Sequence, residues 1–200
     1  MIVLDPIKED ENYAHTMHVV YPRSVIISHG VYDNIVDMIN LKTLISQNID
    51  KTELTNVYGG KTPWNFFNEN KEFLRFVDYL VSKHKNTNSF FNKSNWYDKQ
   101  IGFETWGNEI KKGDEVRFHH HIHHHCILYL SDGDPLILPE LKITIVPKIG
   151  SYYIFPPLIW HGVKKIEKDS GTRYCLVVNF IEKPDWKINK VIQDFKNDRK

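Results

Sequence analysis

The sequence predicts a mainly β protein, an antiparallel barrel or jelly roll (a double-stranded β-helix) supported by helices in its N-terminal half. A change of period carries this prediction, since apolar residues recur with helical spacing before about residue 100 and alternate in short runs beyond it. Turns rich in glycine, proline and aspartate separate these runs, for example at 132–135 and 147–150. Short alternating segments with such turns are typical of antiparallel barrels and jelly rolls.

Two helices are expected before residue 100. The first spans 33–48, where Asp33 or Asn34 can cap the first turn. Its apolar face is predicted from Ile35, Met38, Ile39 and Ile45. The second spans 72–84, and its apolar face is predicted from Phe73, Phe76, Val77, Leu80 and Val81.

The rest of the N-terminal part is expected to hold little regular structure. Residues 1–22 look irregular, and 24–28 read as a short strand that ends at Gly30. Loops are expected at 49–69 and 85–99.

The C-terminal half supplies the strands of the predicted barrel. Alternating runs occupy 101–110, 126–130, 141–146, 151–155 and 174–180. A short helix is expected near the C-terminus, over 183–200. We expect one domain over 1–200, with N-terminal support in 1–99 and the double-stranded β-helix in 100–182.

Composition narrows the class of partner and the compartment. The net charge is +1 with 26% charged residues, so neither nucleic acid nor a membrane is indicated. The two cysteines, Cys126 and Cys175, lie in apolar strand-like runs, as free thiols of a reducing compartment do. The N-terminus does not resemble a signal peptide, and a cytoplasmic protein is expected, in the host cytoplasm if its origin is viral.

The most informative stretch is a tract of histidines. Six of the 11 histidines lie between 119 and 125, interrupted only by Ile122. If the tract is a strand, alternation places four of them on one face, namely His119, His121, His123 and His125. Two imidazoles separated by one residue can bind one ion, and a third ligand would come from a distant strand, with His161 as the candidate.

The tract leaves alternatives open. The metal-binding pair could be His119 with His121, which the spacing from Gly113 favours, or His121 with His123. Asp114 or Glu115 could add a carboxylate. A non-catalytic metal-binding tract or a pH-sensitive surface would also account for so many histidines.

The motifs around this tract resemble known families. Gly113 followed by His119-x-His121 resembles the first cupin motif, although its usual glutamate is missing, and 150–161 resembles the second. The closer resemblance is to prolyl-hydroxylase-like 2-oxoglutarate/Fe(II) oxygenases of phage and bacterial genomes, which share the cupin-like double-stranded β-helix. The matching segments, in order, are Trp106-Gly107-Asn108, Gly113-Asp114, His119-His120-His121, Leu128-Tyr129-Leu130, Leu138-Pro139-Glu140, Pro147-x-x-Gly150, Phe155-Pro156-Pro157, His161-Gly162-Val163, Arg173-Tyr174 and Val178-Asn179-Phe180.

This resemblance implies a dioxygenase that uses Fe(II) and 2-oxoglutarate to hydroxylate an unknown substrate, releasing succinate and CO2. It implies that His119, His121 and His161 bind the metal and that Arg173 binds the far carboxylate of 2-oxoglutarate. His121 stands where such oxygenases usually carry a carboxylate. The remaining candidate cosubstrate contacts, which could equally be structural, are Asn108, Tyr129 and Asn179.

Two other functions are kept beside the hydroxylase. A cupin-type metalloenzyme with three histidine ligands would need the metal and ignore 2-oxoglutarate. A non-catalytic module would keep the fold without the chemistry. The expected partners are 2-oxoglutarate, dioxygen and the unknown substrate, and a homo-oligomer is possible.

Overall fold

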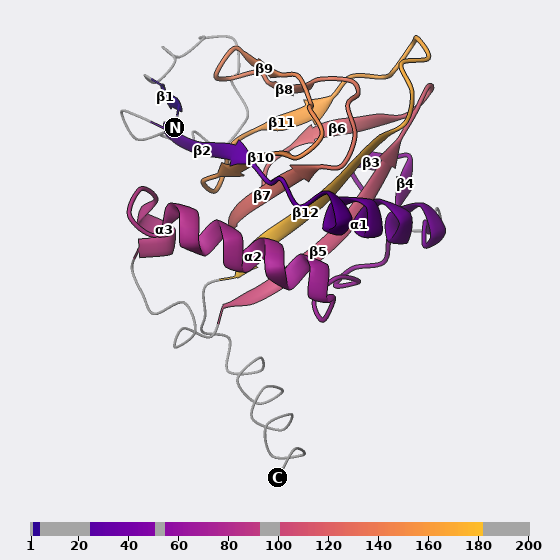
Figure 1. Cartoon of the computed structure of the whole chain (residues 1–200). Helices are drawn as coiled ribbons and strands as arrows, with labels where there is room; N and C mark the ends of the chain where they lie inside the picture. The colour runs from indigo at the N-terminus through magenta and orange to yellow at the C-terminus, as the bar shows by residue number, and fades with distance from the viewer. Residues whose placement is uncertain (1, 5–24, 51–54, 93–100, 182–200) are drawn as a thin grey trace.

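The described part of the chain forms two antiparallel sheets that face each other (Figure 1). The computed structural model describes residues 2–4, 25–50, 55–92 and 101–181. Within them the larger sheet has seven strands, in the spatial order β1 (Ile2–Leu4), β2 (Val25–Val31), β10 (Ser151–Phe155), β7 (His124–Tyr129), β12 (Arg173–Ile181), β5 (Gly102–Ile110) and β4 (Gly60–Lys61). The smaller has five, in the order β3 (Val57–Tyr58), β6 (Glu115–His119), β11 (His161–Val163), β8 (Leu136–Leu138) and β9 (Ile143–Ile145). The predicted double-stranded β-helix is confirmed.

Residues that alternate along the strands fill the space between the sheets. On β12, Cys175 and Val177 face this interior, and Leu176 and Val178 face the opposite side. The inner cluster joins Trp106 and other large-sheet residues to Val116 and further residues of the smaller sheet. A period of two is what a sheet with both faces buried requires.

Two helices cover the outer face of the larger sheet (Figure 1). They are α1 (Ile35–Gln47) and α2 (Lys71–His84), and a one-turn helix, α3 (Ser89–Asn92), follows. The second core lies between these helices and the sheet. The apolar face predicted for α2 is buried there, with Phe73, Phe76 and Leu80 at 0% exposure.

The apolar face predicted for α1 is partly wrong. Met38 and Ile45 are buried, but Ile35 is 51% exposed and Ile39 57% exposed. Leu41 and Asp37 are buried instead, so the helix is turned about its axis relative to the prediction. The cap is Asn34, whose side chain accepts a hydrogen bond from the Asp37 amide.

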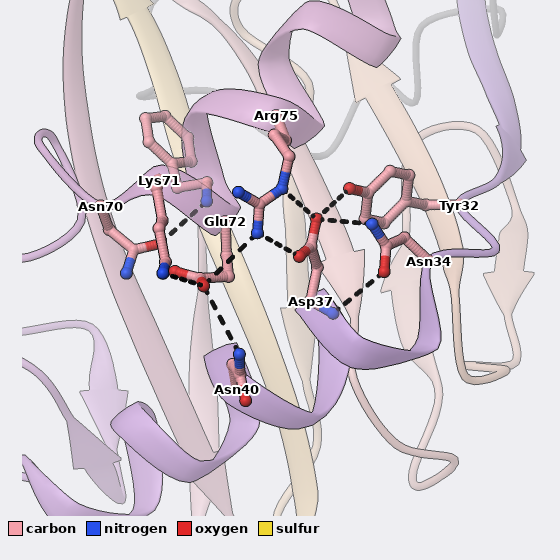
Figure 2. A network of polar contacts seen from close by, with 9 residues as sticks. Tyr32, Asn34, Asp37, Asn40, Asn70, Lys71, Glu72 and Arg75 are labelled. Carbon is pink, nitrogen blue, oxygen red and sulfur yellow. Dashed lines mark hydrogen bonds and ion pairs between the residues drawn. The ribbon is translucent and has the colours of Figure 1, made fainter.

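A polar network at the junction of α1 and α2 explains this rotation (Figure 2). Asp37 accepts hydrogen bonds from the Tyr32 hydroxyl at 2.6 Å and from Arg75 Nε at 3.0 Å. The Arg75 guanidinium also pairs with Glu72 at 3.4 Å. A buried carboxylate needs such partners, so the position of Arg75 determines which side of α1 faces inward.

Several short elements differ from the expectations. The strand expected to stop at Gly30 continues to Val31, because Gly30 pairs with Tyr152 of β10. Strands β3 and β4 lie within the loop expected at 49–69, and α3 within that expected at 85–99. Residues 2–4 form β1, although the stretch 1–22 was expected to be irregular. The rest of that stretch and the C-terminal helix predicted for 183–200 lie outside the described residues, and the single domain stays a prediction. No helix in the described ranges is long and apolar enough to span a membrane.

Candidate metal centre

The histidine tract is a bend between the two sheets. β6 ends at His119, β7 begins at His124, and the residues between them pass from the smaller sheet to the larger one. The tract is therefore not one continuous strand, and the alternation of faces that a strand would impose does not run through it. The histidines with other neighbours are His120, whose ring lies 5.1 Å from Trp160, and His124, whose ring stacks 4.5 Å from Phe90.

Three histidines converge where β6 ends and β11 begins. The candidate ligand atoms of His119, His121 and His161 all lie within 4.8 Å of one another. His119 and His161 are direct partners across β6 and β11, with ring centroids 4.5 Å apart. In the described ranges no carboxylate belongs to this group, and the two acidic candidates are engaged elsewhere, Asp114 with the Lys111 amide and Glu115 with Arg117.

An irregularity in β6 aims His119 inward. His161 pairs with His119 and Val163 with Val116, so β6 has one residue more than β11 over this interval. Such a bulge reverses the alternation, and both Val116 and His119 face the same cavity although they are three residues apart. Gly162 permits the close approach, because a Cβ there would lie 2.8 Å from the Val116 carbonyl oxygen.

Backbone carbonyls orient two of the three rings. Nδ1 of His119 lies 2.7 Å from the Arg117 carbonyl oxygen, and Nδ1 of His161 lies 2.9 Å from that of Ile159. A carbonyl can only accept a hydrogen bond, so in both rings the proton is assigned to Nδ1 and the lone pair to Nε2. Metal-binding histidines commonly have this arrangement.

The spacing of the nitrogens suits a single ion. Nε2 of His119 and Nε2 of His121 are 3.2 Å apart. Two nitrogens that each lie about 2.1 Å from one ion are separated by about 3.0–3.4 Å, depending on the angle at the metal. The residues present therefore fit a metal ion.

Burial keeps these imidazoles neutral. It lowers the pKa of His121 to about 3, with a further contribution from the nearby His119. Burial, and then His119 and His121, hold the pKa of His161 well below its usual value. Burial also lowers the pKa of His119. A neutral imidazole is the form that binds metals.

The bend that carries His121 is held in place from two sides. The Leu158 amide donates a hydrogen bond of 2.8 Å to the His121 carbonyl. Leu158 has a φ of 68°, a strained value for a leucine of the kind often found at functional sites. On the other side the Trp106 ring stacks on His121 at 5.7 Å with an interplanar angle of 15°.

A small cavity between the sheets connects the histidines to Arg173. Its volume is about 40 Å³, and its polar lining comprises His119, His121, His161, Asn108 and Arg173. Arg173 is 2% exposed, and Gly133 packs against it so closely that a Cβ there would lie 2.7 Å from Arg173 Cβ. Its guanidinium donates to the Tyr129 hydroxyl at 3.4 Å, and no carboxylate among the described residues forms an ion pair with it.

The other cosubstrate candidates lie at different distances from the cavity. Asn108 lines it, and its amide nitrogen lies 3.8 Å from Cys175 Sγ. Tyr129 does not line the cavity but contacts Arg173, which does. Asn179 does not line the cavity either, and its side chain donates a hydrogen bond of 3.0 Å to Glu104. Trp106, which belongs to the first matching segment of the sequence, also lines the cavity. Sequence reasoning did not single out Cys175 for this site, although it lies two residues from Arg173 on the same face of its strand.

Unsatisfied polar atoms gather in this region. Among the described residues, five buried side-chain atoms make no hydrogen bond: Asn108 Oδ1, both ring nitrogens of His125, Arg173 Nε and Asn179 Oδ1. All four residues belong to β5, β7 or β12, the adjacent strands that form one wall of the site. Buried polar groups are nearly always paired, so this concentration marks a place built to bind something polar.

Comparison with known proteins gives a likeness of structure and none of sequence. No protein-family model matches the chain, and no curated protein matches it by sequence. A prolyl-4-hydroxylase from Pseudomonas putida superimposes with a TM-score of 0.58 at 13% identity, over 79% of this chain and 93% of that one. For a viral collagen prolyl hydroxylase from Paramecium bursaria Chlorella virus-1, as its 2-oxoglutarate complex, the TM-score is 0.52 at 16% identity, over 76% and 94% of the two chains.

A third solved structure has the same architecture. HygX from Streptomyces hygroscopicus, with nickel and 2-oxoglutarate bound, superimposes with a TM-score of 0.54 at 11% identity, over 78% of this chain and 82% of that one. The chain thus shares its fold with prolyl hydroxylases and HygX over most of their length.

Proposed function

We propose that this protein is an Fe(II)- and 2-oxoglutarate-dependent dioxygenase that hydroxylates a substrate still to be identified. One observation carries the proposal. A fully buried arginine, without a carboxylate partner among the described residues, shares a cavity with three neutral imidazoles that converge on one point. A metal and a dicarboxylate would together satisfy both ends of this cavity.

Arg173 and Tyr129 form the end suited to a carboxylate. Burying an unpaired guanidinium is costly, and a carboxylate that accepts both of its parallel N–H groups would offset that cost. Burial raises the pKa of Tyr129 to about 12, so its hydroxyl keeps its proton. Because that hydroxyl accepts its hydrogen bond from Arg173, its own O–H remains available for the same carboxylate.

His119, His121 and His161 would hold the iron at the other end. Imidazole ligands suit Fe(II), and three neutral ligands leave its charge to be balanced by the 2-oxoglutarate dianion. The iron and cosubstrate would supply the activation of dioxygen, with succinate and CO2 as products beside the hydroxylated substrate. The enclosed cavity is small and suits the distal carboxylate, whereas the keto acid end would lie toward the half-buried His119 and His121.

The apolar lining would keep water from the reacting groups. It consists mainly of Val57, Val116, Ile127, Leu136, Val163 and Val177. A dry wall strengthens the attraction between Arg173 and a carboxylate, since charges interact more strongly in a low dielectric. Asn108 is the remaining polar group positioned to orient the cosubstrate, through its unpaired Oδ1 and its amide nitrogen.

We also place this reaction in the cytoplasm. Both cysteines are free and buried, which suits a reducing compartment. The relationship to phage-type oxygenases stays a prediction.

Anaerobic spectroscopy tests the function directly. With Fe(II) and 2-oxoglutarate, the wild type should show the weak visible charge-transfer band of the chelate, and succinate should form in air. Arg173→Ala should bind Fe(II) and show the band only at much higher 2-oxoglutarate. Arg75→Ala is the matched control, because Arg75 lies on α2 and does not line the cavity.

The outcomes separate the candidate functions. A band and a 2-oxoglutarate affinity that are equal in wild type and Arg173→Ala would contradict the role of Arg173. Stoichiometric metal without any 2-oxoglutarate binding would favour a cupin-type metalloenzyme. Absence of metal binding would leave a non-catalytic module.

A further inference from the structure

His125 is a fourth histidine, and its ring lies beside those of two of the three candidate ligands. It is the second residue of β7 and pairs with Phe155 of β10 on one side and Asn179 of β12 on the other. Its side chain is 0% exposed. The ring lies 4.4 Å from that of His121 and 4.9 Å from that of His161, centroid to centroid.

The surroundings of His125 do not explain why it is a histidine. Neither ring nitrogen makes a hydrogen bond, and leaving a buried polar group unpaired destabilises the folded protein. The ring also stacks on Phe155 at 4.9 Å and 19°. A phenylalanine would make similar stacking contacts without unpaired nitrogens, so packing alone gives no reason for an imidazole.

We propose that His125 is a fourth ligand of the metal centre, an inference that rests on the proposed function. Its two nearest imidazoles are themselves candidate ligands, and a bound ion would satisfy one of its two unpaired nitrogens. In this structure its ring stacks on those of His121 and His161, so ligation requires it to rotate about its side-chain bonds.

A fourth imidazole would make the centre different from a three-ligand site. Four protein ligands would leave less room on the ion for the cosubstrate and dioxygen than three would, so one of the four would have to leave during turnover. His125 is suited to this role because it can return to its stack on Phe155 while the other three ligands stay in place. His125 would thus bind the ion when no cosubstrate is present. It would move off the ion when 2-oxoglutarate binds, while the other three histidines keep the ion in the protein.

Cobalt titration of a ring-for-ring substitution tests the inference. His125→Phe keeps an aromatic ring against Phe155 and removes both nitrogens. Co(II) affinity should fall at least about tenfold, the smaller effect seen when even an outer partner of a ligand is removed. The visible spectrum of bound Co(II) should change with the loss of a ligand. The matched control is His120→Phe, which alters a tract histidine that packs on Trp160, and it should bind Co(II) as the wild type does.

A second measurement avoids dependence on the folding of the variant. In the wild-type Co(II) protein, each coordinated histidine that keeps a ring N–H gives one strongly shifted, exchangeable proton signal in the NMR spectrum. Four such signals are expected, and three would overturn the inference. Unchanged affinity and spectrum in His125→Phe would overturn it as well. A wild type that binds no Co(II) would instead contradict the proposed function itself.

Discussion

Two arginines, Arg75 and Arg173, show how differently this chain uses the same cation. The Arg75 side chain is 47% exposed and pairs with two carboxylates, Asp37 and Glu72 (Figure 2). Arg173 is 2% exposed, and its hydrogen-bond partner among the described residues is the Tyr129 hydroxyl, at 3.4 Å. A cation in water needs a carboxylate partner least, yet within the described residues the exposed arginine has two and the buried one has none.

The difference distinguishes a region whose polar groups are paired within the chain from the region that we propose binds the metal and 2-oxoglutarate. In the network of Asp37, the buried carboxylate is surrounded by Tyr32, Asn34 and Arg75, all of which donate to it. Around the proposed site between the two sheets, four of the described buried residues have side-chain polar atoms without a hydrogen-bond partner. A ligand that supplied the missing partners would offset the cost of these unpaired atoms, and this gain would contribute to its affinity.

The largest expected effect comes from Arg173→Ala. Truncating one member of a buried charge pair costs about 2–5 kcal/mol, so the dissociation constant for 2-oxoglutarate should rise by about 30-fold to several thousand-fold. The free energy of unfolding without ligand should stay equal or increase, because an unpaired buried charge has been removed. Calorimetric titration and urea denaturation measure the two quantities.

Arg75→Ala should reverse that pattern. It should leave 2-oxoglutarate affinity unchanged and lower the urea midpoint, because Asp37 would keep its buried charge without its cation. If both variants lost stability and neither lost affinity, the distinction between the two arginines would be wrong.

Adding Co(II) should stabilise the folded protein through the proposed metal centre between the two sheets. At a Co(II) concentration 100 times its dissociation constant, the free energy of unfolding should rise by about 2.7 kcal/mol. His161→Ala should abolish this gain, because His161 is the candidate ligand from the distant strand. His120→Ala serves as the control and should keep the gain, and thermal melts with and without Co(II) measure it. A full gain in His161→Ala would exclude that residue as a ligand.

A smaller effect is expected from Asp37→Ala. The substitution leaves the buried Tyr32 hydroxyl without its acceptor, which costs about 1–3 kcal/mol. Urea denaturation should show that loss, with Co(II) affinity unchanged. Asp33→Ala is the control, since this exposed residue adjoins the α1 cap without taking part in the network. A loss of Co(II) affinity in Asp37→Ala would show that the two regions are coupled.

The sequence predicted the architecture better than the details that complete the site. Strand β10 has the predicted bounds, and α2 begins one residue before its predicted start. Both predictions succeed because the spacing of apolar residues along an element shows which of its faces is buried. From the sequence, the alternation of side chains along a strand was the available means of placing the histidines of the tract on one face. The bend after His119, the bulge beside it and the strained Leu158 depend on pairing between β6 and β11, which are far apart in sequence. Similarly, the rotation of α1 depends on Arg75, 38 residues after Asp37.

The smallest expected effect is on the acid stability of the two regions. Hydrogen bonding from Arg75 lowers the pKa of Asp37 below its usual value, against the opposing effect of burial. A carboxyl with a lower pKa in the folded state contributes stability that is complete above the unfolded pKa of about 3.9 and is lost as the pH falls through the folded pKa. Each unit of difference is worth about 1.4 kcal/mol, so Asp37→Asn should give a shallower loss of stability between about pH 4 and pH 2. Arg173→Ala should keep the wild-type slope, because Arg173 has no carboxylate partner among the described residues. Urea midpoints measured across this pH range decide the matter: an Arg173→Ala slope as shallow as that of Asp37→Asn would mean that an acidic residue is paired with Arg173 after all.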